Sequence, residues 1–218
     1  MNLATLARIT PGYRDTNIFI RVRTRPLRNY PFYSAHTKGM ERYTSYEHTM
    51  NASRLIREYR LDSLKNEYSA ARKLNLKLQA LGKDKNNYEV VFLTFKKLLE
   101  HESISPNAHM VTTVIAVAGK YGLLEEARYA FNWSRSTDAG SAAKPTSYTY
   151  TAIMQAIGQN ITGESWKEAF QLFDEMLELG LTPNTFTYSA LIRTGVRGGE
   201  NGARQVSGTS TLFSFFMK

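Results

Sequence analysis

The sequence predicts an all-α solenoid, in which helix-turn-helix units stack because no unit can bury its apolar face alone. The first observation is an internal repeat: PTSYTYTAIM at 145–154 returns as PNTFTYSALI at 183–192, an offset of 38 residues. The second is the regular spacing of Pro106, Pro145 and Pro183. Function is therefore expected along a surface rather than in a pocket.

Composition supports a packed core and excludes several classes of site. The 218 residues are 42% hydrophobic and 12% aromatic, which is enough for a core. There is no cysteine, so disulfides and cysteine-based zinc sites are excluded, and the four histidines show no close ligand pairing. The longest apolar run, near 110–118, is too short to span a membrane. We expect no cofactor and no metal. No enzyme is expected either, because paired catalytic carboxylates, a histidine–nucleophile arrangement and a phosphate loop are all missing.

The positive charge is concentrated at the N-terminus. Of the net +9, residues 1–40 carry +6, from six arginines, one lysine and one aspartate. This segment is rich in hydroxyl groups, is interrupted by prolines and lacks a long apolar stretch, which is the pattern of an organellar transit peptide. We predict that it is disordered and that it directs import into the mitochondrial matrix or chloroplast stroma. The alternative is a basic arm that persists and contacts RNA or anionic lipid.

Helices are expected after this segment, because no proline occurs between Met50 and Pro106. The predicted divisions are an N-terminal helical segment over 41–70, a degenerate repeat over 71–107, complete repeats over 108–146 and 147–184, and a partial repeat over 185–218.

Each complete repeat reads as two helices separated by a glycine-containing turn. In the 108–146 repeat the first helix has an apolar stripe at Val111, Val114, Ile115 and Ala118. In the 147–184 repeat the second helix has a stripe at Ala169, Leu172, Phe173 and Met176. Larger aromatic residues are expected in the core and between repeats: Phe131, Trp133, Tyr150, Trp166, Phe173 and Tyr188.

The motifs resemble the pentatricopeptide repeat (PPR) family. They are Thr-Tyr-x-Ala-[Ile/Leu], then Glu-Ala-x-x-x-Phe, then FDEMLELGLTPN. The match is strong over 147–184, good over 108–146 and fair over 71–107. The tetratricopeptide repeat lacks support, because its Trp-x-x-Leu-Gly motif is missing. The resemblance implies a right-handed α-solenoid of about three complete repeats and one partial repeat, which binds a single RNA strand on its concave face.

The resemblance also implies pairs of base-reading residues, one pair for each base. The pairs are Asn75 with Asn107, Thr112 with Thr146, and Thr151 with Asn184, while Ser189 opens a fourth pair. By the family's code, the third pair reads adenine and the first a pyrimidine. The residues alone favour structural roles, since hydroxyl and amide side chains are common helix caps.

Two further sets of residues follow from the resemblance. Tyr148 and Phe186 lie where the family stacks bases, although packing between repeats is the alternative. Lys83, Lys120 and Arg197 correspond to positions near phosphate. A cation next to the carbonyl groups at a helix end is the structural alternative.

We predict an organellar RNA-binding protein that acts as an adaptor in RNA processing, stability or translation. Its partners would be single-stranded RNA, either an organellar transcript or ribosomal RNA, and other proteins of an RNA-processing or ribosomal complex. The alternative is a structural, protein-binding subunit of an organellar ribosome or another complex. Three base-reading pairs are too few to select one transcript.

The C-terminal segment departs from the repeat pattern. After Val196 the sequence has no Glu-Ala-x-x-x-Phe spacing, so no second helix is predicted there. We expect the chain to be truncated or mis-spliced, with residues beyond about Gln205 read from an intron or another frame.

Overall fold

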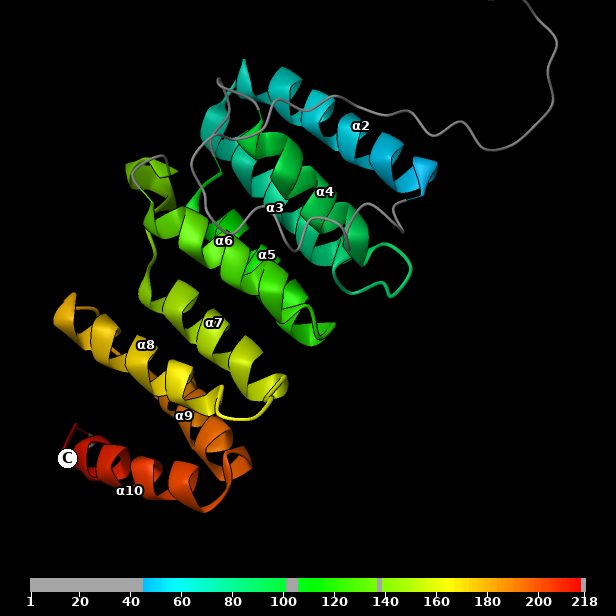
Figure 1. Ribbon diagram of the computed structural model, residues 1–218. Coiled ribbons are helices and arrows are strands. Elements are labelled where there is room, and N and C mark those ends of the chain that lie inside the picture. The colour runs from blue at the N-terminus through cyan, green and yellow to red at the C-terminus, as the bar shows by residue number, and fades with distance from the viewer. Residues whose placement is uncertain (1–44, 101–105, 137–138, 217–218) are drawn as a thin grey trace, which may run out of the picture. The chain divides into compact units, whose positions relative to one another are not determined.

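The computed structural model describes residues 45–100, 106–136 and 139–216 (Figure 1). Within these ranges the regular structure is helical, without a strand. The chain divides into two units, Met1–Arg42 and Tyr43–Lys218, and all described helices belong to the second unit. The predicted transit segment lies outside the described residues. No described helix is both long enough and apolar enough to cross a membrane.

The helices follow one another in pairs after a leading helix (Figure 1). They are α2 (Tyr46–Ser63), α3 (Glu67–Leu81), α4 (Tyr88–Leu99), α5 (Ala108–Lys120), α6 (Leu124–Arg135), α7 (Ser147–Gln159), α8 (Trp166–Glu178), α9 (Thr185–Arg197) and α10 (Gly199–Phe216), with a 3-10 turn η2 (Ser141–Ala143) before α7. The pairs are α3 with α4, α5 with α6, α7 with α8, and α9 with α10. The predicted all-α repeat architecture is confirmed.

The first helix of each pair forms the continuous part of the stack. Helices α3, α5, α7 and α9, here called the A helices, pack against one another in chain order. Each second helix packs against the A helix of its own repeat, and α2 packs against α3 and α4. This arrangement places equivalent residues of successive repeats on neighbouring helices.

A proline followed by a capping residue starts three of the A helices. Asn107, Thr146 and Asn184 directly follow prolines and are the N-caps of α5, α7 and α9. Each cap side chain accepts a hydrogen bond from a backbone N–H in the first turn. Because proline disfavours a helical preceding residue and the cap satisfies a free N–H, this pair fixes where the helix begins.

Recurring glycines let the A helices approach closely. A Cβ atom on Gly119 would lie 2.7 Å from Cβ of Ala156 on α7. The equivalent glycines Gly82 and Gly158 face Val117 and Thr194 of the next A helix in the same way. The contacts between A helices therefore depend on glycine at one position per repeat.

Aromatic side chains join one repeat to the next behind the A helices. Phe131 packs edge-on against Tyr150 at 5.1 Å between ring centroids, and Phe173 packs against Tyr188 at 5.7 Å. Phe95 of α4 similarly meets Trp133 of α6 at 5.6 Å. These contacts confirm that the large aromatic residues of the repeats serve packing.

The prediction that no second helix follows Val196 was wrong. Residues Gly199–Phe216 form α10, which packs against α9. Small residues replace the usual motif: a Cβ atom on Gly195 would lie 2.8 Å from the carbonyl oxygen of Gly202 and would also collide with Val206. Glycine at both positions lets the two helices touch through their backbones. The expectation that the segment comes from another reading frame stays a prediction.

Candidate nucleic-acid interface

The A helices share an open face, here called the A-face, made by side chains spaced three or four residues apart. On α7 these side chains are Tyr148, Thr151, Gln155 and Gln159. Equivalent residues lie 37 to 39 positions apart in neighbouring repeats. The A-face therefore consists of four rows, each with one residue from every repeat.

The rows run from the first turn of the A helices to just beyond the last. The first row is Arg72, His109, Tyr148 and Phe186. The second row is Asn75, Thr112, Thr151 and Ser189. The third row is Gln79, Ala116, Gln155 and Arg193. The fourth row is Lys83, Lys120, Gln159 and Arg197. All of these residues are exposed or half-buried except Thr151.

Sequence reasoning had missed part of this surface. It had not singled out Arg72, His109, Gln79, Gln155 or Arg193. The sequence could have identified Arg72 and His109, because they occupy the same repeat position as Tyr148 and Phe186. The third row needed helix geometry as well, because its residues lie one turn beyond the second row.

The aromatic pair in the first row is exposed. Tyr148 and Phe186 each leave 69% of their surface accessible, on neighbouring helices α7 and α9. Packing between repeats, the structural alternative for these two side chains, does not fit such exposure. Two accessible rings at equivalent positions present flat apolar surfaces on which planar groups can stack.

The second row is linked to the next A helix by side-chain hydrogen bonds. Thr113 Oγ1 donates to Asn75 Oδ1 at 2.7 Å. The hydroxyls of Thr112 and Thr149 lie 3.0 Å apart, and those of Thr151 and Thr187 lie 2.7 Å apart. Thr151 is only 6% exposed as a result. Ser189 is exposed and donates to the carbonyl of Thr185 at 2.8 Å.

The partner residues of the second row are the helix caps. Asn107 Oδ1 accepts from the Met110 N–H at 3.0 Å, and Asn184 Oδ1 accepts from the Thr187 N–H at 3.1 Å. Thr146 shares a capping box with Thr149. The structure thus brings each predicted pair member onto the border of two repeats. The capping role foreseen as an alternative is present at all three positions.

In the fourth row, two cations bind helix ends. Lys120 Nζ donates to the carbonyls of Gly82 at 3.2 Å and Lys83 at 3.4 Å. Arg197 donates in the same way to Gly158 at 2.6 Å. These contacts match the structural alternative, in which a cation satisfies carbonyls that a helix end leaves free. Lys83, the equivalent residue after α3, is exposed.

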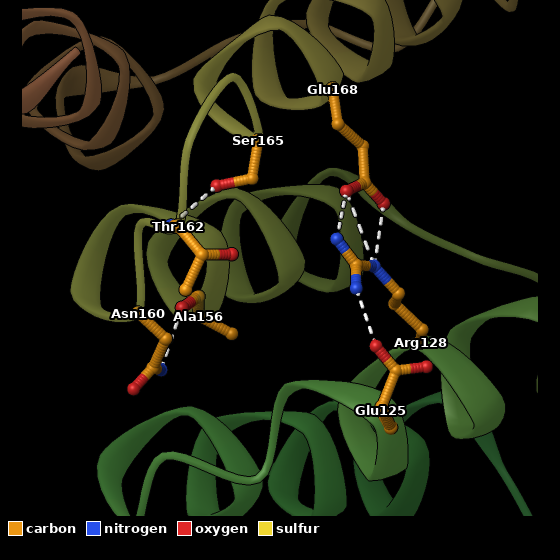
Figure 2. A network of polar contacts seen from close by, with 7 residues as sticks. All are labelled: Glu125, Arg128, Ala156, Asn160, Thr162, Ser165 and Glu168. Atoms are coloured by element: carbon orange, nitrogen blue, oxygen red, sulfur yellow. Dashed lines mark hydrogen bonds and ion pairs between the residues drawn. The ribbon is translucent and has the colours of Figure 1, made fainter. Parts of the chain in front are cut away.

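The same interaction occurs between α5 and the turn after α7. Asn160 Nδ2 donates to the Gly119 carbonyl at 2.9 Å. It also donates to the Ala156 carbonyl at 2.9 Å, as Figure 2 shows. In the turn that follows, the Thr162 N–H donates to Ser165 Oγ at 3.0 Å. The C-terminal carbonyls of α3, α5 and α7 are therefore each satisfied by a side chain from the following repeat.

Ion pairs join the second helices α6 and α8 (Figure 2). Arg128 Nε donates to the Glu168 carboxylate at 3.0 and 3.2 Å, and its Nη1 donates to Glu125 at 2.6 Å. Arg135 pairs with Glu175 at 2.8 Å. A shallow pocket of about 200 Å³ lies among these residues. Its charged lining residues already pair with one another, Arg128 with Glu168 and Arg135 with Glu175.

Tyr150 connects this ion-pair cluster to α7. Its hydroxyl donates to Glu175 Oε1 at 2.7 Å. Burial, together with the hydrogen bond to the Glu175 carboxylate, raises the pKa of Tyr150 well above its ordinary value. Within the described ranges no group of three or more histidine, aspartate or glutamate side chains is placed to hold a metal ion.

Comparison with known proteins identifies relatives. Residues 145–195 match the PPR repeat family. The chain is 33% identical over 118 residues to the pentatricopeptide repeat-containing protein At1g71460, chloroplastic, from Arabidopsis thaliana. That alignment covers 54% of this chain and 14% of the relative, so the chain spans only a small part of its length.

Two solved structures also match part of the chain. Nuclear proteinaceous RNase P 2 (PRORP2) from A. thaliana has a TM-score of 0.50 at 19% identity, covering 75% of this chain and 37% of that chain. The pentatricopeptide repeat protein PPR10 in complex with an 18-nt psaJ RNA element has a TM-score of 0.46 at 21% identity, covering 75% and 25%. PRORP2 supports the fold, while the match over 145–195 and the curated relative support a pentatricopeptide repeat protein family.

Proposed function

We propose that the chain binds single-stranded RNA along the A-face, with one base at each repeat. The observation that carries the proposal is the exposed pair Tyr148 and Phe186 at equivalent positions of adjacent A helices. Stacking of a base on an aromatic side chain contributes about 1–3 kcal/mol. The candidate base-reading residues Thr151 and Ser189 lie about one helical turn after these rings, where short polar groups would meet the edge of a stacked base.

The charge of the A-face agrees with a polyanionic ligand. Its described cations are Arg72, Lys83, Lys120, Arg193 and Arg197, and no row contains an acidic residue. Lys120 and Arg197 already donate to carbonyls. They would therefore contribute to phosphate binding through long-range electrostatic attraction rather than through direct contact. Lys83, Arg72 and Arg193 are exposed and are the better candidates for direct contact.

The proposed cellular role is an organellar adaptor in RNA processing, stability or translation that acts by binding rather than by catalysis. The Arg-rich segment 1–40 and the chloroplastic relative support import into an organelle. Whether that organelle is the mitochondrion or the chloroplast is decided by imaging the full chain fused to a fluorescent protein. Fluorescence that stays in the cytosol would contradict the import.

A protein-binding subunit is the second candidate, and the outer side of α9 favours it. Val196 is 66% exposed, and Ile192 is exposed beside it. The equivalent residues of α7, Gly158 and Met154, are buried. An apolar helix face of this kind fits another helix. Purification from cells with and without nuclease treatment separates the two candidates, since partners that persist without RNA indicate direct protein binding.

The RNA-binding proposal is tested by titrating labelled single-stranded and double-stranded RNA with the full chain and its variants. Tyr148→Ala and Phe186→Ala should each weaken binding to single-stranded RNA about 5- to 100-fold, from the loss of one stacking contact. Tyr46→Ala on α2 is the matched control, since Tyr46 is 68% exposed but lies outside the A-face. Equal effects of the control and the A-face variants would refute the proposal.

The base-reading assignment has its own test. Asn184→Asp replaces an amide with a carboxylate that only accepts hydrogen bonds. If Thr151 with Asn184 reads adenine, the variant should shift the preferred base at that position from adenine toward guanine, whose exposed edge donates. Selection from a random single-stranded RNA pool measures this. An unchanged preference would show that Asn184 is only a helix cap.

A further inference from the structure

The two members of the third base-reading pair are connected through one buried residue. Thr187 Oγ1 lies 2.7 Å from Thr151 Oγ1 and donates to Asn184 Oδ1 at 3.3 Å. It also accepts from the Asn184 backbone N–H at 3.2 Å. Thr187 itself is 0% exposed and so cannot contact a ligand on the A-face. One hydroxyl therefore bonds both residues of the pair.

The second pair has the same connection. Thr149 Oγ1 lies 3.0 Å from Thr112 Oγ1 and 3.2 Å from Thr146 Oγ1. Thr149 is also completely buried. The first pair lacks this connection, because Met110 occupies the equivalent position in α5. Asn75 bonds instead to Thr113, and Asn107 bonds to the Met110 N–H.

The connection exceeds what a helix cap requires. A capping box needs only two reciprocal hydrogen bonds, each from a backbone N–H to a side chain, between the cap and the third helical residue. The bond from Thr187 to Thr151 runs to the preceding repeat and satisfies no free backbone group at the start of α9. It makes the position of one reader depend on the other.

The connection also determines which amide atom of Asn184 faces outward. Oδ1 accepts both the N–H and the hydroxyl of Thr187. The two donors hold the amide oxygen toward α9, so the Nδ2 group, which only donates, is directed away from the cap. Among the described residues Nδ2 donates to no protein acceptor. Asn184 therefore presents a hydrogen-bond donor.

We propose that Thr187 and Thr149 are positioning residues that set base selectivity at the third and second pairs without touching the RNA. The inference rests on the proposed RNA-binding function. Thr187 couples the Thr151 hydroxyl to the Asn184 amide, so a base meets both groups in one fixed arrangement. The first pair, without such a threonine, is held by two independent hydrogen bonds and should discriminate less.

The test compares base preferences of the full chain and its variants by selection from a random single-stranded RNA pool. Thr187→Val removes the hydroxyl and should reduce discrimination about two- to tenfold at one nucleotide position, the effect of one or two lost hydrogen bonds. Thr187→Ser retains the hydroxyl and should retain the preference. Thr149→Val should have the same effect at the adjacent position.

Thr194→Val is the matched control. Thr194 lies on the same helix, is equally buried, and donates only to the Ala190 carbonyl at 2.8 Å. It should lower stability without changing any base preference. If Thr187→Val and Thr194→Val weaken binding to all four bases alike, Thr187 is merely structural and the inference is overturned. If the unaltered chain binds no RNA, the proposed function fails and the inference fails with it.

Discussion

Replacing Gly119 by alanine tests whether the close approach of the A helices holds the repeats together. The new Cβ atom would lie 2.7 Å from Cβ and 2.8 Å from Cα of Ala156. Neither atom can rotate away, because both are fixed to the backbone of α7. The variant therefore fits only if α5 and α7 move apart.

The magnitude follows from opposing effects. Alanine favours a helix interior by about 1 kcal/mol over glycine. Overpacking costs about 1–3 kcal/mol. Separation of the helices also stretches the Thr112–Thr149 bond of 3.0 Å and the Asn160 bond to the Gly119 carbonyl of 2.9 Å, each worth about 1 kcal/mol. The net expectation is a loss of about 1–3 kcal/mol in the free energy of unfolding.

Urea denaturation followed by far-UV circular dichroism measures the change. Gly208→Ala is the matched control, because Gly208 lies in α10 with no atom within 4 Å of a new Cβ. It should be neutral or should stabilise the chain by up to about 1 kcal/mol. If Gly119→Ala is as stable as Gly208→Ala, the close approach of α5 and α7 does not limit stability and the reasoning is refuted.

Two further predictions concern helix ends and pH. Arg197→Met should lower stability by about 1 kcal/mol through loss of the bond to the Gly158 carbonyl, and should reduce the salt dependence of RNA affinity less than Arg193→Met does. Arg193→Met is the control, because Arg193 is an exposed cation of the A-face. If Arg197→Met instead reduced the slope of log affinity against log salt concentration by about one, Arg197 would be a phosphate contact. Folding raises the pKa of Tyr150 above its ordinary value of 10.0. The protonated Tyr150 hydroxyl therefore contributes its full stabilisation below pH 10.0, and this contribution is lost as the pH rises from 10.0 through the folded-state pKa. When the pH is raised from below to above this value, the urea midpoint should fall less for Tyr150→Phe than for the unaltered chain. An equal fall in both would contradict the raised pKa of Tyr150.

Local features of the fold could be predicted because they depend on nearby residues. A proline followed by Asn107, Thr146 or Asn184 signals a helix start wherever it occurs. Helix α10 could not be predicted from the family motif. Its contact with α9 depends on Gly195 and Gly202, which meet only when both helices are in place.

The sequence by itself determined the helix pairs of the complete repeats, the register of the repeats and the second row of the A-face, because helix periodicity and repeat offset are properties of the chain alone. Only the tertiary structure decided how these residues are used. It showed that Arg197 binds the end of the preceding A helix, that Thr151 is bonded to Thr187, and that Tyr148 stays exposed. The physical reason is that hydrogen bonding and burial between repeats depend on the distance between neighbouring A helices. That distance is set by how residues far apart in the sequence pack together.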